Sequence, residues 1–132
     1  MPDVLLVVDD LFFLAKIQQT AKLTDVSVET VAPGKLHESI AEKGSGDAIR
    51  GVVVDLNHRS GSAVDLIRGL KDDPSTATLL VIGFLSHVQA DLAQAARSAG
   101  CDMVLARSAF TQQLPALLRK LAGKGAPETE RS

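Results

Sequence analysis

Residues 51–57 read Gly-Val-Val-Val-Asp-Leu-Asn, and the apolar, β-branched run at their start is followed by the carboxylate of Asp55. Three consecutive valines favour a strand, and a strand without polar alternation is typical of one that is buried on both faces. A second run of the same kind, Val4–Val8, ends in the adjacent acids Asp9 and Asp10. Because parallel sheets are built from such strands, the two stretches together predict an α/β fold.

Outward from these two runs, strand-like segments alternate with segments of helical spacing. We expect strands at 4–8, 26–31, 49–56, 79–85 and 103–106, and helices at 11–23, 36–43, 62–71, 88–99 and 111–121. The last helix starts near Thr111, because Pro115 is tolerated only in a first turn. This alternation implies a five-stranded parallel sheet with helices on both faces, in one domain over 1–122. Residues 123–132 form a polar tail.

The composition excludes several classes of protein. The net charge is −2, there is no Trp or Tyr, and only four Phe are present, so neither a basic surface nor aromatic base stacking supports nucleic-acid binding. One cysteine, Cys101, excludes an internal disulfide and any multi-cysteine metal site. No signal peptide is recognisable, and no apolar stretch approaches the roughly 20 residues that span a bilayer. We therefore expect a cytoplasmic protein without a membrane contact.

The carboxyl ends of parallel strands meet at one edge of the sheet, where such folds bind their ligands. This rule brings together Asp9, Asp10, Asp55, Leu85, Ser86 and Arg107. Three neighbouring carboxylates repel one another unless a cation binds or one pKa rises, and oxygen ligands alone suit Mg²⁺. A carboxylate beside Mg²⁺ can attack phosphorus, and Asp55 is the best candidate nucleophile. The alternative is that Asp10 caps the first helix and Asp9 only ends a strand.

The acids at the two strand ends, and the spacing between them, resemble the receiver domain of two-component response regulators. The resemblance covers about residues 4–121 and implies a (βα)5 flavodoxin-like fold. It implies that Asp9, Asp10, Asp55 and the backbone carbonyl of Asn57 hold Mg²⁺, with Asp55 as the phosphoacceptor. It also implies a histidine kinase or phosphotransfer protein as donor and a downstream protein as partner, and it leaves room for a homodimer.

The sequence departs from this family where receivers sense or transmit phosphorylation. The usual Thr or Ser position holds Leu85, which cannot donate a hydrogen bond, with Ser86 beside it. The usual Lys position holds Arg107, whose planar fork differs from an ammonium group. The aromatic position of strand five holds Val104, and His58–Arg59 replaces the usual Met-Pro pair.

Two functions remain open at this point. In the first, the chain accepts a phosphoryl group on Asp55 with Mg²⁺ and signals through protein contacts. In the second, it is a pseudo-receiver that binds a partner without phosphorylation. We expect no enzyme: phosphatases with an Asp nucleophile carry D-x-D on one strand end, and a flavin carrier needs a Ser/Thr/Gly-rich loop where this chain has Leu11-Phe12-Phe13. Of Phe12 and Phe13, one should face the core and the other the solvent.

Overall fold

The computed structural model describes residues 3–42, 49–86 and 89–123 of the 132-residue chain. Its strands are β1 (Val4–Val7), β2 (Val28–Thr30), β3 (Gly51–Asp55), β4 (Leu80–Leu85) and β5 (Met103–Ala106). Its helices are α1 (Leu11–Leu23), the 3₁₀ turn η1 (Pro33–Lys35), α2 (Leu36–Glu42), α3 (Ala63–Asp72), α4 (Ala90–Ser98), α5 (Arg107–Gln112) and α6 (Leu114–Leu121). The expected tail lies outside the described residues, apart from Gly123.

The five strands form one parallel sheet in the order β2-β1-β3-β4-β5. This confirms the predicted flavodoxin-like sheet. The chain moves outward from β1 to the edge strand β2 and then crosses to β3 on the other side of β1. In this topology the order reverses between β1 and β3, so the carboxyl ends of these two strands flank the crevice in which such folds place their sites.

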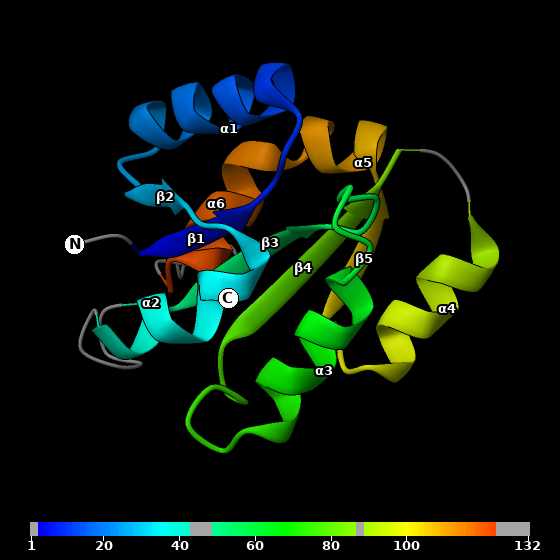
Figure 1. Cartoon of the computed structure of the whole chain (residues 1–132). Coiled ribbons are helices and arrows are strands. Elements are labelled where there is room, and N and C mark those ends of the chain that lie inside the picture. The colour runs from blue at the N-terminus through cyan, green and yellow to red at the C-terminus, as the bar shows by residue number, and fades with distance from the viewer. Residues whose placement is uncertain (1–2, 43–48, 87–88, 124–132) are drawn as a thin grey trace, which may run out of the picture.

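Helices cover both faces of the sheet, as expected (Figure 1). Helices α1, α5 and α6 pack on one face, where the buried side chains include Ile17, Phe110 and Leu118. Helices α2, α3 and α4 pack on the other face, where they include Leu36 and Ile67. The valines of β3 alternate between these two cores, which explains why that strand is apolar throughout.

The prediction was wrong about the last helix. The chain is already helical from Arg107, and the helical segment is divided at Gln113, which occupies the C-cap position of α5 and the N-cap position of α6. Pro115 then lies in the first turn of α6, as its missing N–H requires. The structure therefore has two short helices after β5, and α5 places Phe110 in the core.

Several other strands and helices are shorter than predicted. Strand β2 covers only Val28–Thr30, because it lies at the edge of the sheet and pairs with β1 alone. Helix α4 begins at Ala90, whereas its predicted start, residue 88, lies outside the described part.

Cys101 precedes β5 and is a packing residue. Its side chain is buried, and burial raises the pKa of the Cys101 thiol to about 11. The thiol therefore stays protonated at neutral pH. Within the described ranges, none of the helices has the length and apolar character to cross a bilayer.

Candidate functional site

The predicted site residues meet at the carboxyl edge of the sheet. Asp9 follows β1, Asp10 caps α1, Asp55 ends β3, Leu85 ends β4 and Arg107 begins α5. Side-chain contacts join these strand ends although the partners lie far apart in sequence: Arg107 contacts Asp10, and Arg59 contacts Asp9. The predicted convergence is therefore observed.

Asp9 is held by the segment that follows β3. Its Oδ2 accepts hydrogen bonds from the backbone N–H and from Nε of Arg59, both at 3.1 Å. The backbone hydrogen bond, together with the nearby His58 and the Arg59 charge, lowers the pKa of the Asp9 carboxyl. Asp9 is thus an ionised acid with a cation of the chain itself beside it.

Asp10 serves two groups at once. Its Oδ1 accepts from the backbone N–H groups of Phe12 and Phe13, at 3.0 and 3.1 Å, and so caps α1. Its Oδ2 lies 3.2 Å from Nη1 of Arg107. The Phe13 hydrogen bond and the Arg107 charge lower the pKa of the Asp10 carboxyl. The capping role that the alternative gave Asp10 is confirmed, and the same carboxylate forms an ion pair in addition.

Asp55 is the buried acid of the site. Its side chain is 3% exposed, and its Oδ1 accepts the backbone N–H of Asn57 at 2.9 Å. Burial raises the pKa of the Asp55 carboxyl, and the Asp9 charge adds to the rise; the Asn57 N–H and the Arg107 charge oppose it. The sequence left two alternatives for three neighbouring carboxylates, a bound cation or one raised pKa; the pKa of Asp55 is raised, with burial as a larger cause than the Asp9 charge.

The two residues at the end of β4 have different roles. Leu85 is buried in the core between the sheet and α3 and α4, so its position offers no hydrogen-bond donor to the site. Ser86 is exposed, and its N–H and Oγ donate to Oδ1 of Asn57 at 2.8 and 3.2 Å. Its hydroxyl is thus engaged by an amide side chain.

Arg107 lies over an aromatic cluster made of Phe13, Phe84 and Phe110. Neighbouring ring centroids in this cluster are 4.7 to 5.8 Å apart. The guanidinium carbon is 4.6 Å from the centroid of Phe13 and 5.7 Å from that of Phe84. Such stacking suits the planar guanidinium and would not suit an ammonium group equally well. Arg107 is therefore fixed by the rings below it and by Asp10 beside it.

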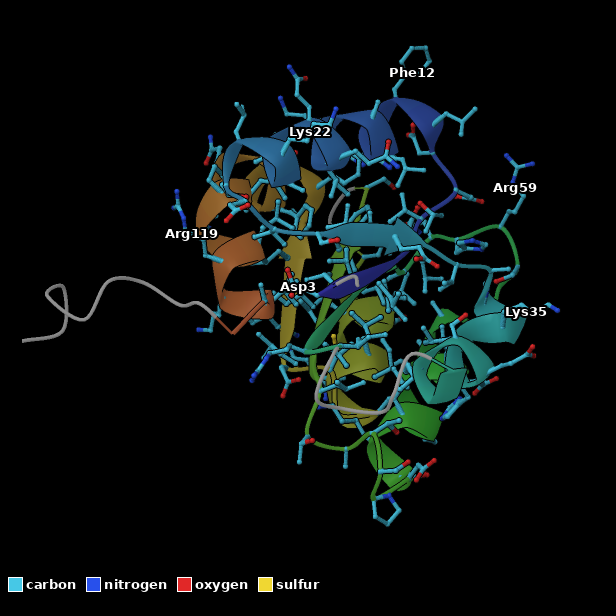
Figure 2. The ribbon with its side chains drawn as sticks, turned by 90° about the vertical axis from the view of Figure 1, so that its left-hand side faces the viewer. Asp3, Phe12, Lys22, Lys35, Arg59 and Arg119 are labelled. Atoms are coloured by element: carbon cyan, nitrogen blue, oxygen red, sulfur yellow. The ribbon has the colours of Figure 1, made fainter. Side chains whose placement is uncertain are left out.

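The two phenylalanines after the acids face opposite ways, as predicted. Phe13 is 7% exposed and belongs to the aromatic cluster, whereas Phe12 is 93% exposed. Figure 2 shows Phe12 projecting from the start of α1 away from the body of the protein. Leu11 beside it is also exposed, which leaves an apolar rim on this side of the site.

A divalent-cation site would need the carboxylates of Asp9, Asp10 and Asp55 to face one point. Over the described residues, no three His, Cys, Asp or Glu side chains are grouped so that they could hold a metal ion. Asp10 uses both oxygens for the α1 cap and Arg107, and Asp9 faces Arg59. As arranged, these acids do not fit Mg²⁺, because arginines stand where the cation's charge is needed.

His58, Ser60 and Asp9 lie together but cannot form a catalytic relay. His58 Nδ1 is 3.1 Å from Ser60 Oγ and 4.0 Å from Asp9 Oδ2. A Ser–His–Asp relay needs the hydroxyl and the acid at opposite nitrogens of the ring, and here both contacts use the same nitrogen. This group has the composition of a hydrolase triad without its geometry.

Sequence reasoning missed three participants in the site. Arg59 was noted only as a replacement, Asn57 only for its carbonyl, and Gln89 not at all. The Asn57 side chain bridges two loops, since its Nδ2 donates to Oε1 of Gln89 at 2.8 Å. The doublet His58–Arg59 after Asp55 was the signal in the sequence for Arg59, and no pattern indicated the side-chain contact between Asn57 and Gln89.

Comparison with solved structures identifies the fold. A response regulator of Hahella chejuensis matches with a TM-score of 0.76 and 16% identity, over 96% of this chain and 100% of that one. The response regulator RPA3017 in red light signalling of R. palustris matches at 0.75 and 19%, over 96% and 97%. The Mn²⁺-bound form of response regulator Rcp1 matches at 0.69 and 13%, over 88% and 91%.

These identities are low, and the likeness concerns the fold. No protein-family model matches the chain, and no curated protein matches its sequence. The class is nevertheless defined by architecture: this chain has the fold of response regulator receiver domains, with an arginine-paired acidic site at the carboxyl edge of its sheet.

Proposed function

We propose that this chain is a cytoplasmic, receiver-type signalling module that acts by binding another protein and not by catalytic turnover. A fold by itself does not fix a function, so the site has to support one. The site consists of acids, arginines and an amide that bond to one another, and its one Ser–His–Asp grouping lacks relay geometry. This arrangement suits a module that presents a surface.

In the form that the geometry favours, partner binding does not wait for a phosphoryl group on Asp55. The observation that carries this proposal is the pairing of each acid after β1 with its own arginine: Asp9 with Arg59, and Asp10 with Arg107. These arginines supply the positive charge that the acids would otherwise take from a metal ion. Leu85 supports the same conclusion, because it leaves the site without the hydroxyl that receivers use to read a phosphoryl group.

A second candidate is the phosphoacceptor function, with a histidine kinase or phosphotransfer protein as donor and Mg²⁺ as cofactor. Its specific support is Asp55, which ends β3 in the crevice and lies close enough to Asp9 and Arg107 for both charges to change its pKa. In addition, Rcp1, which shares the fold, binds Mn²⁺. A carboxylate oxygen of Asp55 would form the new bond to phosphorus while the bond from phosphorus to the donor's nitrogen or oxygen breaks. Asp9 and Asp10 would first have to leave their arginines.

Intact-mass measurement separates the two candidates. Wild type and Asp55→Asn are treated with Mg²⁺ and a small acyl phosphate. A receiver domain that becomes phosphorylated under these conditions serves as the positive control. The favoured form predicts no phosphoryl adduct on either variant, and equal affinity of both for any protein partner, with and without the donor. An adduct on the wild type that Asp55→Asn lacks would establish the second candidate instead.

A further inference from the structure

Asn57 joins the buried acid of the site, which its backbone contacts, to the start of α4, which its side chain contacts. The backbone N–H of Asn57 donates to Oδ1 of Asp55 at 2.9 Å. The side-chain Oδ1 accepts from Ser86 N–H at 2.8 Å, and Nδ2 donates to Oε1 of Gln89 at 2.8 Å. Because a backbone N–H can only donate, the oxygen of the amide must face Ser86, which fixes the orientation of Asn57. One residue thus contacts the end of β3, the end of β4 and the N-cap of α4.

The far end of this link lies at a groove between α4 and β5. Gln89 and Leu85 line this groove of about 390 Å³, together with Val104 of β5. Gln89 is the N-cap residue of α4, yet its side chain makes no capping hydrogen bond and is used for Asn57. One side-chain hydrogen bond therefore connects Asn57 to the beginning of α4.

The hydrogen bond between Asp55 and Asn57 depends on the charge of Asp55. A carboxylate accepts a stronger hydrogen bond from an N–H than a neutral group does, so neutralising Asp55 weakens its hold on residue 57. Leu85 cannot act as a second connection from the site to α4, because its side chain carries no polar atom and lies in the core. The polar route from Asp55 to α4 that the structure shows runs through Asn57.

We propose that Asn57 is a positioning residue that couples the state of Asp55 to α4 and to the α4–β5 groove. This inference rests on the receiver-type function proposed above, and it holds for both candidate forms, since any change at Asp55 would use the same route. Coupling between two sites is established by measuring it, because proximity alone does not demonstrate it.

The test measures how Asp55→Asn changes backbone amide signals in two backgrounds, wild type and Asn57→Ala, by ¹H–¹⁵N NMR. In the wild-type background, the signals of residue 57, Ser86, Gln89 and Ala90 should move. In the Asn57→Ala background, residue 57 should still move, because alanine keeps the N–H that Asp55 accepts. The signals of Ser86, Gln89 and Ala90 should then move no more than those of α2, a reference helix that makes no hydrogen bond with Asn57 among the described contacts.

Gln89→Ala provides the matched control, because it removes the second hydrogen bond of Asn57 and no helix cap. In that background, Ser86 should still respond to Asp55→Asn and the α4 signals should not. Asn57 is exposed, so its replacement should leave the fold intact. If Asn57→Ala does not fold, Gln89→Ala alone tests the same hydrogen bond. Equal movement of the α4 signals in all backgrounds, or no movement in the wild type, would overturn the proposal. This test uses no phosphodonor, metal or partner. Its failure therefore differs from a failure of the proposed function, because the proposed function fails when Asp55 is phosphorylated or when no partner binds.

Discussion

The stacking of Arg107 on Phe13 should be measurable as a coupling free energy between the two side chains. The guanidinium carbon lies 4.6 Å from the ring centroid, and the Arg107 side chain is 32% exposed. A cation–π contact contributes about 0.5–1 kcal/mol at exposed sites and about 2 kcal/mol when it is desolvated. Arg107 lies between these limits, because its Nε is buried without a hydrogen-bond partner while the rest of the group reaches solvent. We therefore expect a coupling of about 1 kcal/mol.

A double-mutant cycle of Phe13→Leu and Arg107→Met, followed by urea unfolding, gives this value. Phe13→Leu keeps an apolar side chain in the core and removes the aromatic face, at an expected cost of about 1 kcal/mol. Arg107→Met also breaks the Asp10 ion pair, but that loss occurs in both arms of the cycle and cancels. The double variant should be less destabilised than the sum of the single variants. A sum that is additive within about 0.3–0.5 kcal/mol, the usual scatter for independent sites, would refute the stacking contribution.

Three further predictions concern the site and its support. Asp55→Asn should raise the free energy of unfolding at neutral pH, because it removes a buried carboxylate whose charge is unfavourable there. The pKa of Asp55 is higher in the folded protein than the 3.8 of an ordinary Asp in the unfolded chain, so the folded state binds this proton more tightly. The stability of the wild type should therefore fall as the pH rises from 3.8 through the raised pKa of the folded state. Urea unfolding across that range should show the advantage of Asp55→Asn vanishing in acid, and parallel curves would contradict the burial effect. Arg59→Gln should change stability by less than about 1 kcal/mol, because the side chain is 87% exposed. By freeing Asp9 it should also allow Mg²⁺ to shift the amide signals around Asp9 in an NMR titration, which the wild type should not show. Arg68→Gln, which breaks the exposed pair with Asp65, is its control, and equal Mg²⁺ affinity in all three proteins would count against the arginine's role. Gly51→Ala should destabilise the protein by about 1–3 kcal/mol in thermal unfolding, since overpacking costs that much and a Cβ would lie 2.8 Å from the Leu121 carbonyl oxygen. Gly34→Ala, where a Cβ meets nothing within 4 Å, should have little effect, and equal losses at both glycines would show that the contact with α6 is not the cause.

The sheet could be predicted because its strands are encoded locally. The residues of β3 are apolar on both faces, which is typical of a strand in a parallel sheet covered by two layers of helices. The convergence of Asp9, Asp55 and Arg107 followed from topology, since each residue ends or follows a strand and all carboxyl ends share one edge. The division between α5 and α6 was missed, because Pro115 permits a helix start without excluding a separate helical turn before it.

The partners of the acids could not be predicted, because they depend on loops. Arg59 reaches Asp9 across 50 residues, and Arg107 reaches Asp10 across 97. Whether an acid faces an arginine or a cation is decided by side-chain direction at the end of a strand, which no periodicity in the sequence encodes. The side-chain contacts of Asn57 could not be predicted for the same reason. The sequence pointed to its backbone carbonyl, whereas its side chain contacts Ser86 and Gln89, which follow β4.

The burial of Cys101 has a practical consequence for measuring motion and binding. Its thiol is shielded and has a pKa of about 11, so at neutral pH it should react slowly with maleimides and other thiol reagents. A single cysteine introduced at Phe12, which is 93% exposed at the rim of the site, would then carry a fluorophore or spin label selectively. The native sequence thus already provides a nearly silent background for site-directed labelling, and a probe at the rim could report on partner binding without removal of the natural cysteine.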